Sequence, residues 1–523
     1  MYANTSGNVW GDETRMTGNN GEQDQMNTGH DTRTIRRVVI AGGGTAGWMA
    51  AAALSKTLGR VLDITLVESE EIGTVGVGEA TIPTLVTFHR LLDINEQEFM
   101  AATQATIKLG IGFEHWRDRD QHYIHSFGTT GKDHWTAGFQ HFWLEGRHRG
   151  LARDYGDYCL ELRAAQEARF AHLPNGGINY AFHLDTGRYA RFLRQFSEGF
   201  GVRRVEGKIR NVLTRAADGH IEALELDDGS RIEGDLFIDC TGFRALLIGQ
   251  TLGVGFEDWS HWLFCDSAFA VQSTSVRPPI PYTRSIAGEA GWQWRIPLQS
   301  RSGNGIVFSS RFIDNEAALA TLLGSIEGEP LLEPRLLRFC PGQRQRSWQG
   351  NCVALGLAGG FLEPLESTNI HLIQRGIVRL LQCFPAVLSQ TTIDEYNQQT
   401  AAEITHIRDF IILHYHVTQR RDTPFWRAAA EMSIPATLQH RIDLFRETAQ
   451  VFRVPNELFA ENSWVQVMLG QGIEPWSWHP VTRLMPDPEL SGFLEAIRST
   501  VERGMRQLAP HQQYLERYCP APA

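Results

Sequence analysis

The sequence predicts a mixed α/β fold with a Rossmann-type βαβ unit near its N-terminus and a helical C-terminal part. A glycine-rich turn stands between a β-branched run and an alanine-rich stretch in "RRVVIAGGGTAGWMAAAAL". Two more glycine-bearing turns follow apolar runs far downstream, in "GDLFIDCTGFRALL" and "ALGLAGGFLEPLEST". Towards the C-terminus, apolar residues recur at helical spacing, as at Ile393, Tyr396, Ile404, Ile407 and Ile411. This order indicates an α/β module followed by covering helices.

Composition and charge are those of an ordinary soluble enzyme. The chain has 523 residues, of which 42% are hydrophobic and 21% charged, and its net charge is −11. We find no basic cluster of the kind that nucleic acid needs, so we exclude that partner. The seven cysteines are scattered without a CxxC pair, which favours reduced thiols in a cytoplasm over a disulfide framework or a zinc site.

The first 34 residues read as a disordered extension. They are rich in Asn, Thr and Gly and contain no apolar run of signal-peptide length. No run of about 18 apolar residues occurs anywhere, so we expect no helix that spans a membrane. These features predict a cytoplasmic protein.

The first glycine-rich turn has the context of a dinucleotide site. Val38–Ala41 is the first strand, Gly42, Gly44 and Gly47 fit G-x-G-x-x-G, and "VLDITLVESEE" is a second strand that ends at Glu68. The first glycine makes the turn, the second lets a pyrophosphate approach the helix N-terminus, and the third lets the helix pack on the strand. The acid is expected to accept hydrogen bonds from ribose hydroxyls. This pattern alone does not separate NAD from FAD.

The two downstream turns favour FAD. Leu236–Ile238 is an apolar strand that ends in "DCTG", and Cys352–Leu355 precedes "GLAGG". Glycine-bearing turns so widely spaced along the chain are typical of an FAD-binding monooxygenase-like fold with an inserted substrate sheet, rather than of a compact NAD domain.

"GWQWRIPL" places two indoles two residues apart. The simplest interpretation is a strand whose Trp292 and Trp294 share one face and pack in a core. A functional role is the alternative, and the rest of the sequence bears on it.

Four motifs, "GGGTAGWMAA", "GVGEATIP", "GWQWRIP" and "FLEPLEST", occur in the order found in flavin-dependent tryptophan halogenases. The chain resembles that family from about Arg36 to its C-terminus. The resemblance implies halogenation of an electron-rich ring, an indole above all, by an enzyme that uses FADH2, O2 and chloride or bromide. Because we find no second fingerprint for NAD(P)H, a separate flavin reductase must supply the reduced flavin.

The resemblance also implies which residues surround the flavin. Trp292, Trp294, Ile296 and Pro297 would form a barrier that keeps the organic substrate away from the reacting flavin. The expected cofactor contacts are Gly42, Gly44, Thr45, Ala46, Gly47, Trp48, Glu68, Glu79, Ala80, Ile209, Gly356, Leu357 and Ile370.

Lys108, Glu366 and Ser367 match the family's catalytic positions. Hypohalous acid formed at the flavin would reach Lys108, whose ammonium can donate to it or whose amine can itself be halogenated. Glu366 would orient the oxidant and accept the ring proton. The alternatives are a solvated strand lysine and an acid that stabilises the first turn of a helix by about 0.3–1 kcal/mol. Ser367 or Thr368 is expected to cap that helix.

Substrate and halide contacts follow from the same resemblance. His125 and Phe127 would sandwich the ring, with Trp464 as a further contact, although the first two also fit an amphipathic strand. The halide would lie at the backbone of Thr368 and Asn369, where the free-tryptophan enzymes usually have Gly at the second position. Gly470 and Gly472 stand where those enzymes have paired tyrosines, which favours free indoles over tryptophan.

The expected organisation has three parts: residues 1–34, an FAD-binding halogenase module over 35–385, and a helical part over 386–523 that closes the substrate pocket. We predict no metal site, since His414 and His416 lie on different faces of a helix. A homodimer is one assembly that the sequence allows. A flavoprotein hydroxylase or reductase on the same fold is the second interpretation, and a non-enzymatic flavin-binding protein is the third.

Overall fold

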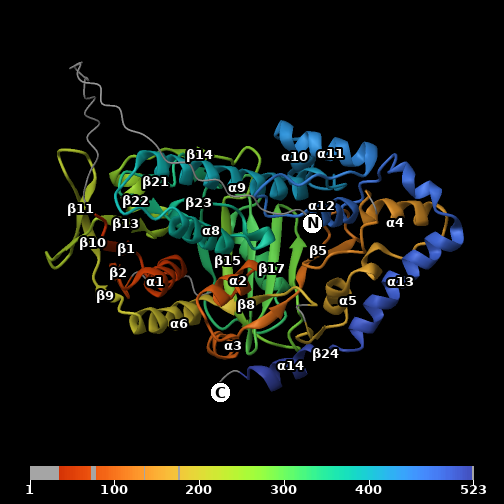
Figure 1. The fold of residues 1–523 in the computed structure, drawn as a ribbon, viewed down its shortest axis with the longest axis horizontal. Coiled ribbons are helices and arrows are strands. Elements are labelled where there is room, and N and C mark those ends of the chain that lie inside the picture. Colours follow the sequence, from red (N-terminus) through yellow and green to blue (C-terminus); the bar gives the residue numbers. More distant parts are fainter. Residues whose placement is uncertain (1–33, 72–77, 135, 175–176, 521–523) are drawn as a thin grey trace, which may run out of the picture.

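A computed structural model describes residues 34–71, 78–134, 136–174 and 177–520 (Figure 1). The predicted N-terminal extension therefore lies outside the described residues, apart from its last position. The predicted mixed α/β fold is confirmed. Two large sheets lie side by side, and helices cover them.

The six-stranded sheet carries the Rossmann-type unit. Its order is β21-β22-β13-β1-β2-β9, and all neighbours pair in parallel except the edge strand β21. β-branched and leucine side chains that are buried on both faces explain why these strands form the centre of a parallel sheet. The strands are β1 (Arg37–Ala41), β2 (Asp63–Glu68), β9 (Arg203–Glu206), β13 (Leu236–Asp239), β21 (Trp348–Gln349) and β22 (Cys352–Ala354).

The seven-stranded sheet is mostly antiparallel. Its order is β19-β15-β18-β17-β16-β5-β6, and only β16 and β5 pair in parallel. The strands are β5 (Gly110–Glu114), β6 (His122–Ser126), β15 (Ser267–Thr274), β16 (Thr283–Ala287), β17 (Gly291–Pro297), β18 (Arg301–Phe308) and β19 (Arg335–Arg338).

Smaller sheets join these two. The order β3-β8-β4 brings Gly78–Ala80 and the strand that ends at Lys108 together across β8. The strands of the smaller sheets are β3 (Gly78–Ala80), β4 (Thr106–Lys108), β7 (Arg169–Phe170), β8 (Ala181–Asp185), β10 (Ile209–Thr214), β11 (Ile221–Leu226), β12 (Arg231–Glu233), β14 (Phe256–Asp258), β20 (Gly342–Arg344), β23 (Gly360–Phe361) and β24 (Ala509–Pro510).

Helices pack on both sheets, and α1 lies beside β1 and β2 in Figure 1. Those of the first part are α1 (Thr45–Leu58), α2 (Thr84–Leu91), α3 (Glu96–Thr103), α4 (Phe139–His148), α5 (Leu160–Gln166), α6 (Thr186–Gly199), α7 (Asn315–Ser325) and α8 (Asn369–Gln382). The predicted helical C-terminal part is confirmed and contains α9 (Gln390–His416), α10 (Pro424–Glu431), α11 (Ala436–Thr448), α12 (Glu461–Gly470), α13 (Asp487–Met505) and α14 (His511–Tyr518). No helix in the described ranges is long and apolar enough to cross a membrane.

Candidate active site

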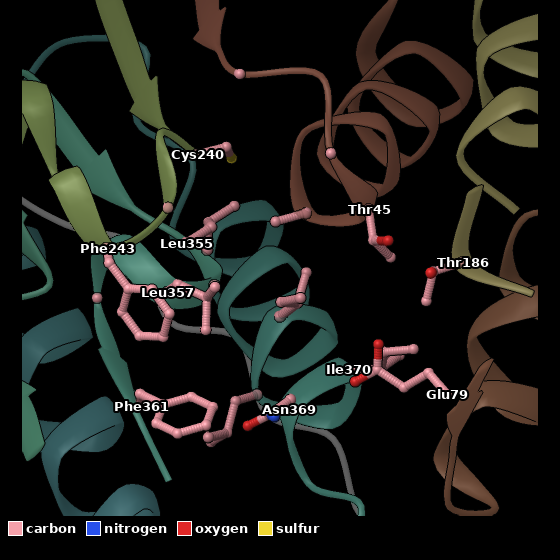
Figure 2. Close-up of a pocket in the computed structure, with 18 of the residues that line it drawn as sticks. Thr45, Glu79, Thr186, Cys240, Phe243, Leu355, Leu357, Phe361, Asn369 and Ile370 are labelled. Atoms are coloured by element: carbon pink, nitrogen blue, oxygen red, sulfur yellow. The ribbon is translucent and has the colours of Figure 1, made fainter. Parts of the chain in front are cut away.

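A pocket of about 1120 Å³ opens where the parallel sheet meets the seven-stranded sheet. The glycine-rich turn after β1, the start of α1 and the segment from residue 354 to 373 line it. Figure 2 shows Thr45, Glu79 and Ile370 around it, with Asn369 and Phe361 further along the wall. The volume exceeds the roughly 300–1,000 Å³ of common small-ligand sites, as a dinucleotide requires.

The three glycines of the turn have different geometric reasons to be glycine. Gly42 has φ +109°, and a Cβ there would lie 2.3 Å from the carbonyl oxygen of Cys240. A Cβ on Gly47 would lie 1.9 Å from the carbonyl oxygen of Gly42, so the helix can pack this closely only without a side chain. A Cβ on Gly44 would meet nothing within 4 Å, which leaves its backbone free to face a ligand.

The predicted cofactor residues divide into two groups. Gly47 and Trp48 lie behind the pocket wall, where the Trp48 indole N–H donates to Glu68 over 3.4 Å. Glu68 lines the pocket, and one of its oxygens accepts from Arg204 over 2.5 Å. The other predicted residues also line it: Gly42, Gly44, Thr45, Ala46, Glu79, Ala80, Ile209, Gly356, Leu357 and Ile370. Burial raises the pKa of Glu79 to about 7.

The tryptophan pair lies on one face of β17 and lines the pocket, together with Ile296. The ring centroids of Trp292 and Trp294 are 6.2 Å apart. On its far side, Trp292 lies 6.4 Å from Trp116, whose ring is in turn 6.3 Å from that of His414. The expected strand and shared face therefore coincide with a wall of the pocket. Pro297 does not line the pocket.

Lys108 is fully buried at the end of β4, unlike a solvated strand lysine. Its Nζ donates to the Thr81 carbonyl over 3.0 Å and to Ser367 Oγ over 2.7 Å. Burial lowers the pKa of this amine to about 7, although the charge of Glu366 opposes the shift. The ammonium also lies 5.2 Å from the ring centroid of Phe127.

Ser367 connects the pocket to the buried lysine, because it lines the pocket and contacts Lys108. It adopts a left-handed conformation with φ +60°, two residues before Asn369, the first residue of α8. The expected side-chain cap at this helix is wrong. Neither Ser367 nor Thr368 caps the N-terminus: the serine oxygen accepts from lysine, and the threonine hydroxyl is buried without a partner among the described residues.

Glu366 is buried between two histidines from distant parts of the chain. His125 Nδ1 on β6 lies 2.9 and 3.1 Å from its two oxygens, and His414 Nε2 on α9 lies 2.9 Å from Oε1. Burial alone would raise the pKa of this carboxyl, but the charges and hydrogen bonds of both histidines lower it to about 2. Glu366 is therefore an ionised group in an interior site.

The other predicted substrate residues lie in the same interior. Phe127 flanks Lys108, whereas His125 faces Glu366. Trp464 is buried on α12, where its N–H donates to Glu457 over 3.0 Å and the guanidinium of Arg441 lies 4.1 Å from its ring. Of the two predicted halide residues, Asn369 begins α8 and lines the pocket, and Thr368 lies behind it.

Sequence reasoning missed two buried residues of this interior. Glu363 accepts hydrogen bonds from the Trp292 indole over 3.0 Å and from Tyr415 over 2.6 Å, and burial raises its pKa to about 7. The sequence pattern bears on His414 only as a metal ligand. No local signal indicates either contact, because both join segments that are far apart in sequence. Within the described ranges, no cluster of three metal-ligating side chains occurs.

Comparisons with known proteins agree on one family. The model of the tryptophan halogenase family matches residues 37–487. The tryptophan 7-halogenase RebH of Lentzea aerocolonigenes is 35% identical over 513 residues, which cover 91% of this chain and 96% of RebH.

Solved structures agree as well. Xcc4156, a flavin-dependent halogenase from Xanthomonas campestris, superimposes with a TM-score of 0.93 at 70% identity. The superposition covers 94% of this chain and 100% of the Xcc4156 chain. BrvH, a flavin-dependent halogenase from Brevundimonas sp. BAL3, has a TM-score of 0.89 at 45% identity, with coverages of 93% and 99%. The overall fold is thus shared with solved flavin-dependent halogenases.

Proposed function

This chain belongs to the tryptophan halogenase family and is a flavin-dependent halogenase, and from that premise we propose how its residues halogenate an aromatic ring. The observation that carries the proposal is the contact between Lys108 Nζ and Ser367 Oγ at 2.7 Å. Ser367 lines the large pocket, so the buried amine stands one side chain away from it.

The residues of the pocket fit FAD. The turn after β1 leaves the backbone of Gly44 open at the start of α1, where a pyrophosphate is favoured by free N–H groups. Thr45, Ala46 and Glu68 would hold the adenosine half, and Glu79, Ile209 and Leu357 line the remaining wall. When bound, reduced flavin and O2 supply the oxidation of a halide ion to hypohalous acid. A separate flavin reductase provides the reduced cofactor.

Trp292 and Trp294 separate the pocket from the interior. Both indoles are buried, and Trp292 is held by its hydrogen bond to Glu363. Rigid rings in this wall admit a halide or hypohalous acid but exclude an aromatic substrate from the flavin. A halide is favoured near Thr368 and Asn369, because the N-terminus of α8 offers unpaired N–H groups.

Lys108 donates a hydrogen bond from Nζ to the hypohalous acid and makes its halogen more electrophilic. The substrate ring then forms a carbon–halogen bond, and the hydroxyl of the acid leaves as water with a proton from the ammonium. Glu366 accepts the proton that the ring carbon loses, since it is ionised and lies within the electrostatic reach of Lys108. Loss of this proton from Glu366 and uptake of a proton by Lys108 restore both groups, so the sum is ring C–H plus hypohalous acid to ring C–halogen plus water.

The substrate is an indole without a charged head group. An aromatic interior surrounds His125, where the rings of Phe410 and Phe459 stack at 3.8 Å and Phe410 lies 4.7 Å from Trp464. The buried carboxylate beside it, Glu457, is already occupied by Arg441 and the Trp464 N–H. An amino-acid ammonium would have to displace Arg441 from Glu457 or compete with the histidines for Glu366, and burying it unpaired costs several kcal/mol.

The test is product analysis with indole, reductase, NADH, FAD and O2, with and without bromide. We expect bromoindole by mass spectrometry only when bromide is present. Hydroxylated indole in both reactions would instead identify a monooxygenase on the same fold. No product, with reduced flavin consumed by O2 at the same rate whether indole is present or absent, would contradict any action on an indole ring.

A further inference from the structure

The buried carboxylate of Glu366 must be stabilised by neighbouring groups if it is to act as a base. The carboxylate is 1% exposed, and a buried charge requires a partner. Within the described residues, its ion-pair partners are histidines alone, since the nitrogen of Lys108 bonds Thr81 and Ser367 instead. The two histidines differ in how they are held.

His414 forms a hydrogen bond at one ring nitrogen and lies close to Glu366 with the other. Its Nδ1 lies 2.8 Å from the carbonyl oxygen of Phe410, one turn earlier on α9. A carbonyl only accepts, so Nδ1 must carry a hydrogen. His125, by contrast, contacts Glu366 through Nδ1, and its buried Nε2 has no partner among the described residues. Nε2 of His414 also has no hydrogen bond among the described residues, but unlike Nε2 of His125 it lies 2.9 Å from a carboxylate oxygen, Glu366 Oε1.

The tautomer at Nδ1 decides what lies between His414 and the carboxylate. In a neutral ring, Nε2 would present a lone pair to Glu366 Oε1 at 2.9 Å, and the two lone pairs would repel. In this geometry, His414 Nε2 does not form a hydrogen bond. Catalytic hydrogen bonds nevertheless often straighten only when ligands are bound, and 2.9 Å is within bonding distance. A proton between these atoms removes the repulsion and leaves an imidazolium beside a carboxylate.

We infer that His414 is a positioning residue for Glu366, a cationic partner that holds the carboxylate ionised and aims it at the site of the ring proton. The inference rests on the proposed role of Glu366. The other titratable groups that face this carboxylate are His125, Lys108 and Tyr123. The remaining side chains packed on the imidazole include Phe113 and Trp116, which are uncharged.

The test compares His414→Phe and His414→Gln with the parent, using indole, bromide and chemically reduced FAD. We expect His414→Phe to lower kcat about tenfold with little change in KM, because the carboxylate still exists but is less often ionised and aligned. The decrease in kcat relative to the parent should grow as the pH falls from about 8 to about 6, because Glu366 takes up a proton more readily without its cationic partner. His414→Gln, which restores a neutral donor, should recover much of the rate at the alkaline end only.

His416→Gln is the matched control, since this partly exposed histidine lies two residues further along α9. It should keep the parental rate and pH profile. If both His414 variants lose the same fraction of kcat at every pH and KM rises, His414 only packs against its neighbours and the inference is wrong. If His414→Phe does not fold, the pH profile of His414→Gln alone decides, because an unchanged profile overturns the inference.

A spectroscopic measurement tests the charge without turnover. In protein labelled with 15N-histidine, the signal lost in His414→Gln should show two protonated ring nitrogens near pH 7. A neutral ring at that pH would refute the inference. Glu366→Gln distinguishes failure of the proposed role of Glu366 from failure of the positioning role of His414. If Glu366→Gln retains full activity, the proposed role of Glu366 fails. If it is inactive while the His414 variants are fully active, only the positioning role is contradicted.

Discussion

The proposed flavin pocket and the proposed catalytic interior are neighbours that are built in opposite ways. Backbone shape makes the pocket, since Gly42, Gly44 and Gly47 stand where a side chain would collide or block a ligand. Charged side chains make the interior, where Lys108 and Glu366 are both buried. The pocket is therefore encoded locally, whereas the interior exists only after distant strands and helices have packed together.

This difference predicts that cofactor binding and chemistry can be lost independently. A change in the interior should abolish chemistry while leaving cofactor binding intact, and a change in the glycine turn should weaken binding while leaving the interior charges in place. Trp292 and Ser367 form the boundary, because each lines the pocket and contacts a residue of the interior.

The largest effect is expected for Lys108. Lys108→Ala, and the bulkier Lys108→Met, remove the ammonium that activates the oxidant and should lower kcat at least about a hundredfold, or about 2.7 kcal/mol. FAD affinity should be unchanged in both, as measured by fluorescence titration. The methionine variant controls for the cavity that alanine leaves. A variant that keeps more than about a tenth of the rate would falsify the assigned role.

Glu366→Gln should slow turnover by about one to two decades. The amide has the same shape but cannot accept the ring proton, so the fold and the binding of indole should persist. Single-turnover bromination with chemically reduced FAD measures this step directly. If the variant is as fast as the parent, Glu366 only stabilises the start of the helix and is not the proton acceptor.

The pH profile distinguishes the two forms of Lys108. Because the pKa of this amine is lowered to about 7, the ammonium predominates below that pH and the free amine above it. If the ammonium activates the oxidant, kcat should fall about tenfold for each pH unit above about 7. Chemically reduced FAD removes the reductase's own pH dependence. A rate that rises through the same range would favour halogenation of the amine itself.

Gly44→Ala tests the pocket side of the comparison. Its Cβ would meet nothing within 4 Å in the free protein, so the melting temperature should stay close to that of the parent. The methyl group would face the pyrophosphate, and we expect FAD affinity to fall about tenfold, or about 1.4 kcal/mol. Gly199→Ala, equally unhindered but outside the pocket lining, is the control. Equal affinity in both variants would place the pyrophosphate elsewhere.

The smallest expected effect is the preference for substrate. In a competition between equimolar indole and L-tryptophan at limiting enzyme, indole should be halogenated several-fold faster. The reason is that Glu457 is already paired with Arg441 and cannot bind an ammonium. Liquid chromatography with mass spectrometry measures both products at low conversion. Predominant halotryptophan would show that another group binds the charged head.

Much of the pocket could be predicted because its signals are local. Spacing alone indicated the strand that ends at Ala41, the glycines and the acid Glu68, and a two-residue period placed Trp292 and Trp294 on one face. The resemblance to a known family singled out Lys108 and Glu366, but nothing in the sequence indicated how deeply they are buried. The expected helix cap failed because Ser367 accepts from Lys108 instead.

The sequence by itself determined the α/β class, the glycine-rich turn, the tryptophan strand and the helical C-terminal part, since each follows from periodicity or from glycine geometry over a few residues. Only the tertiary structure decided that His125 from β6 and His414 from α9 meet on the carboxylate of Glu366. His125 is 241 positions from Glu366 and His414 comes from a different helix, so no local pattern specifies these contacts. Their energies also depend on burial, because low polarity strengthens a charge pair and shifts each pKa only after water has been excluded.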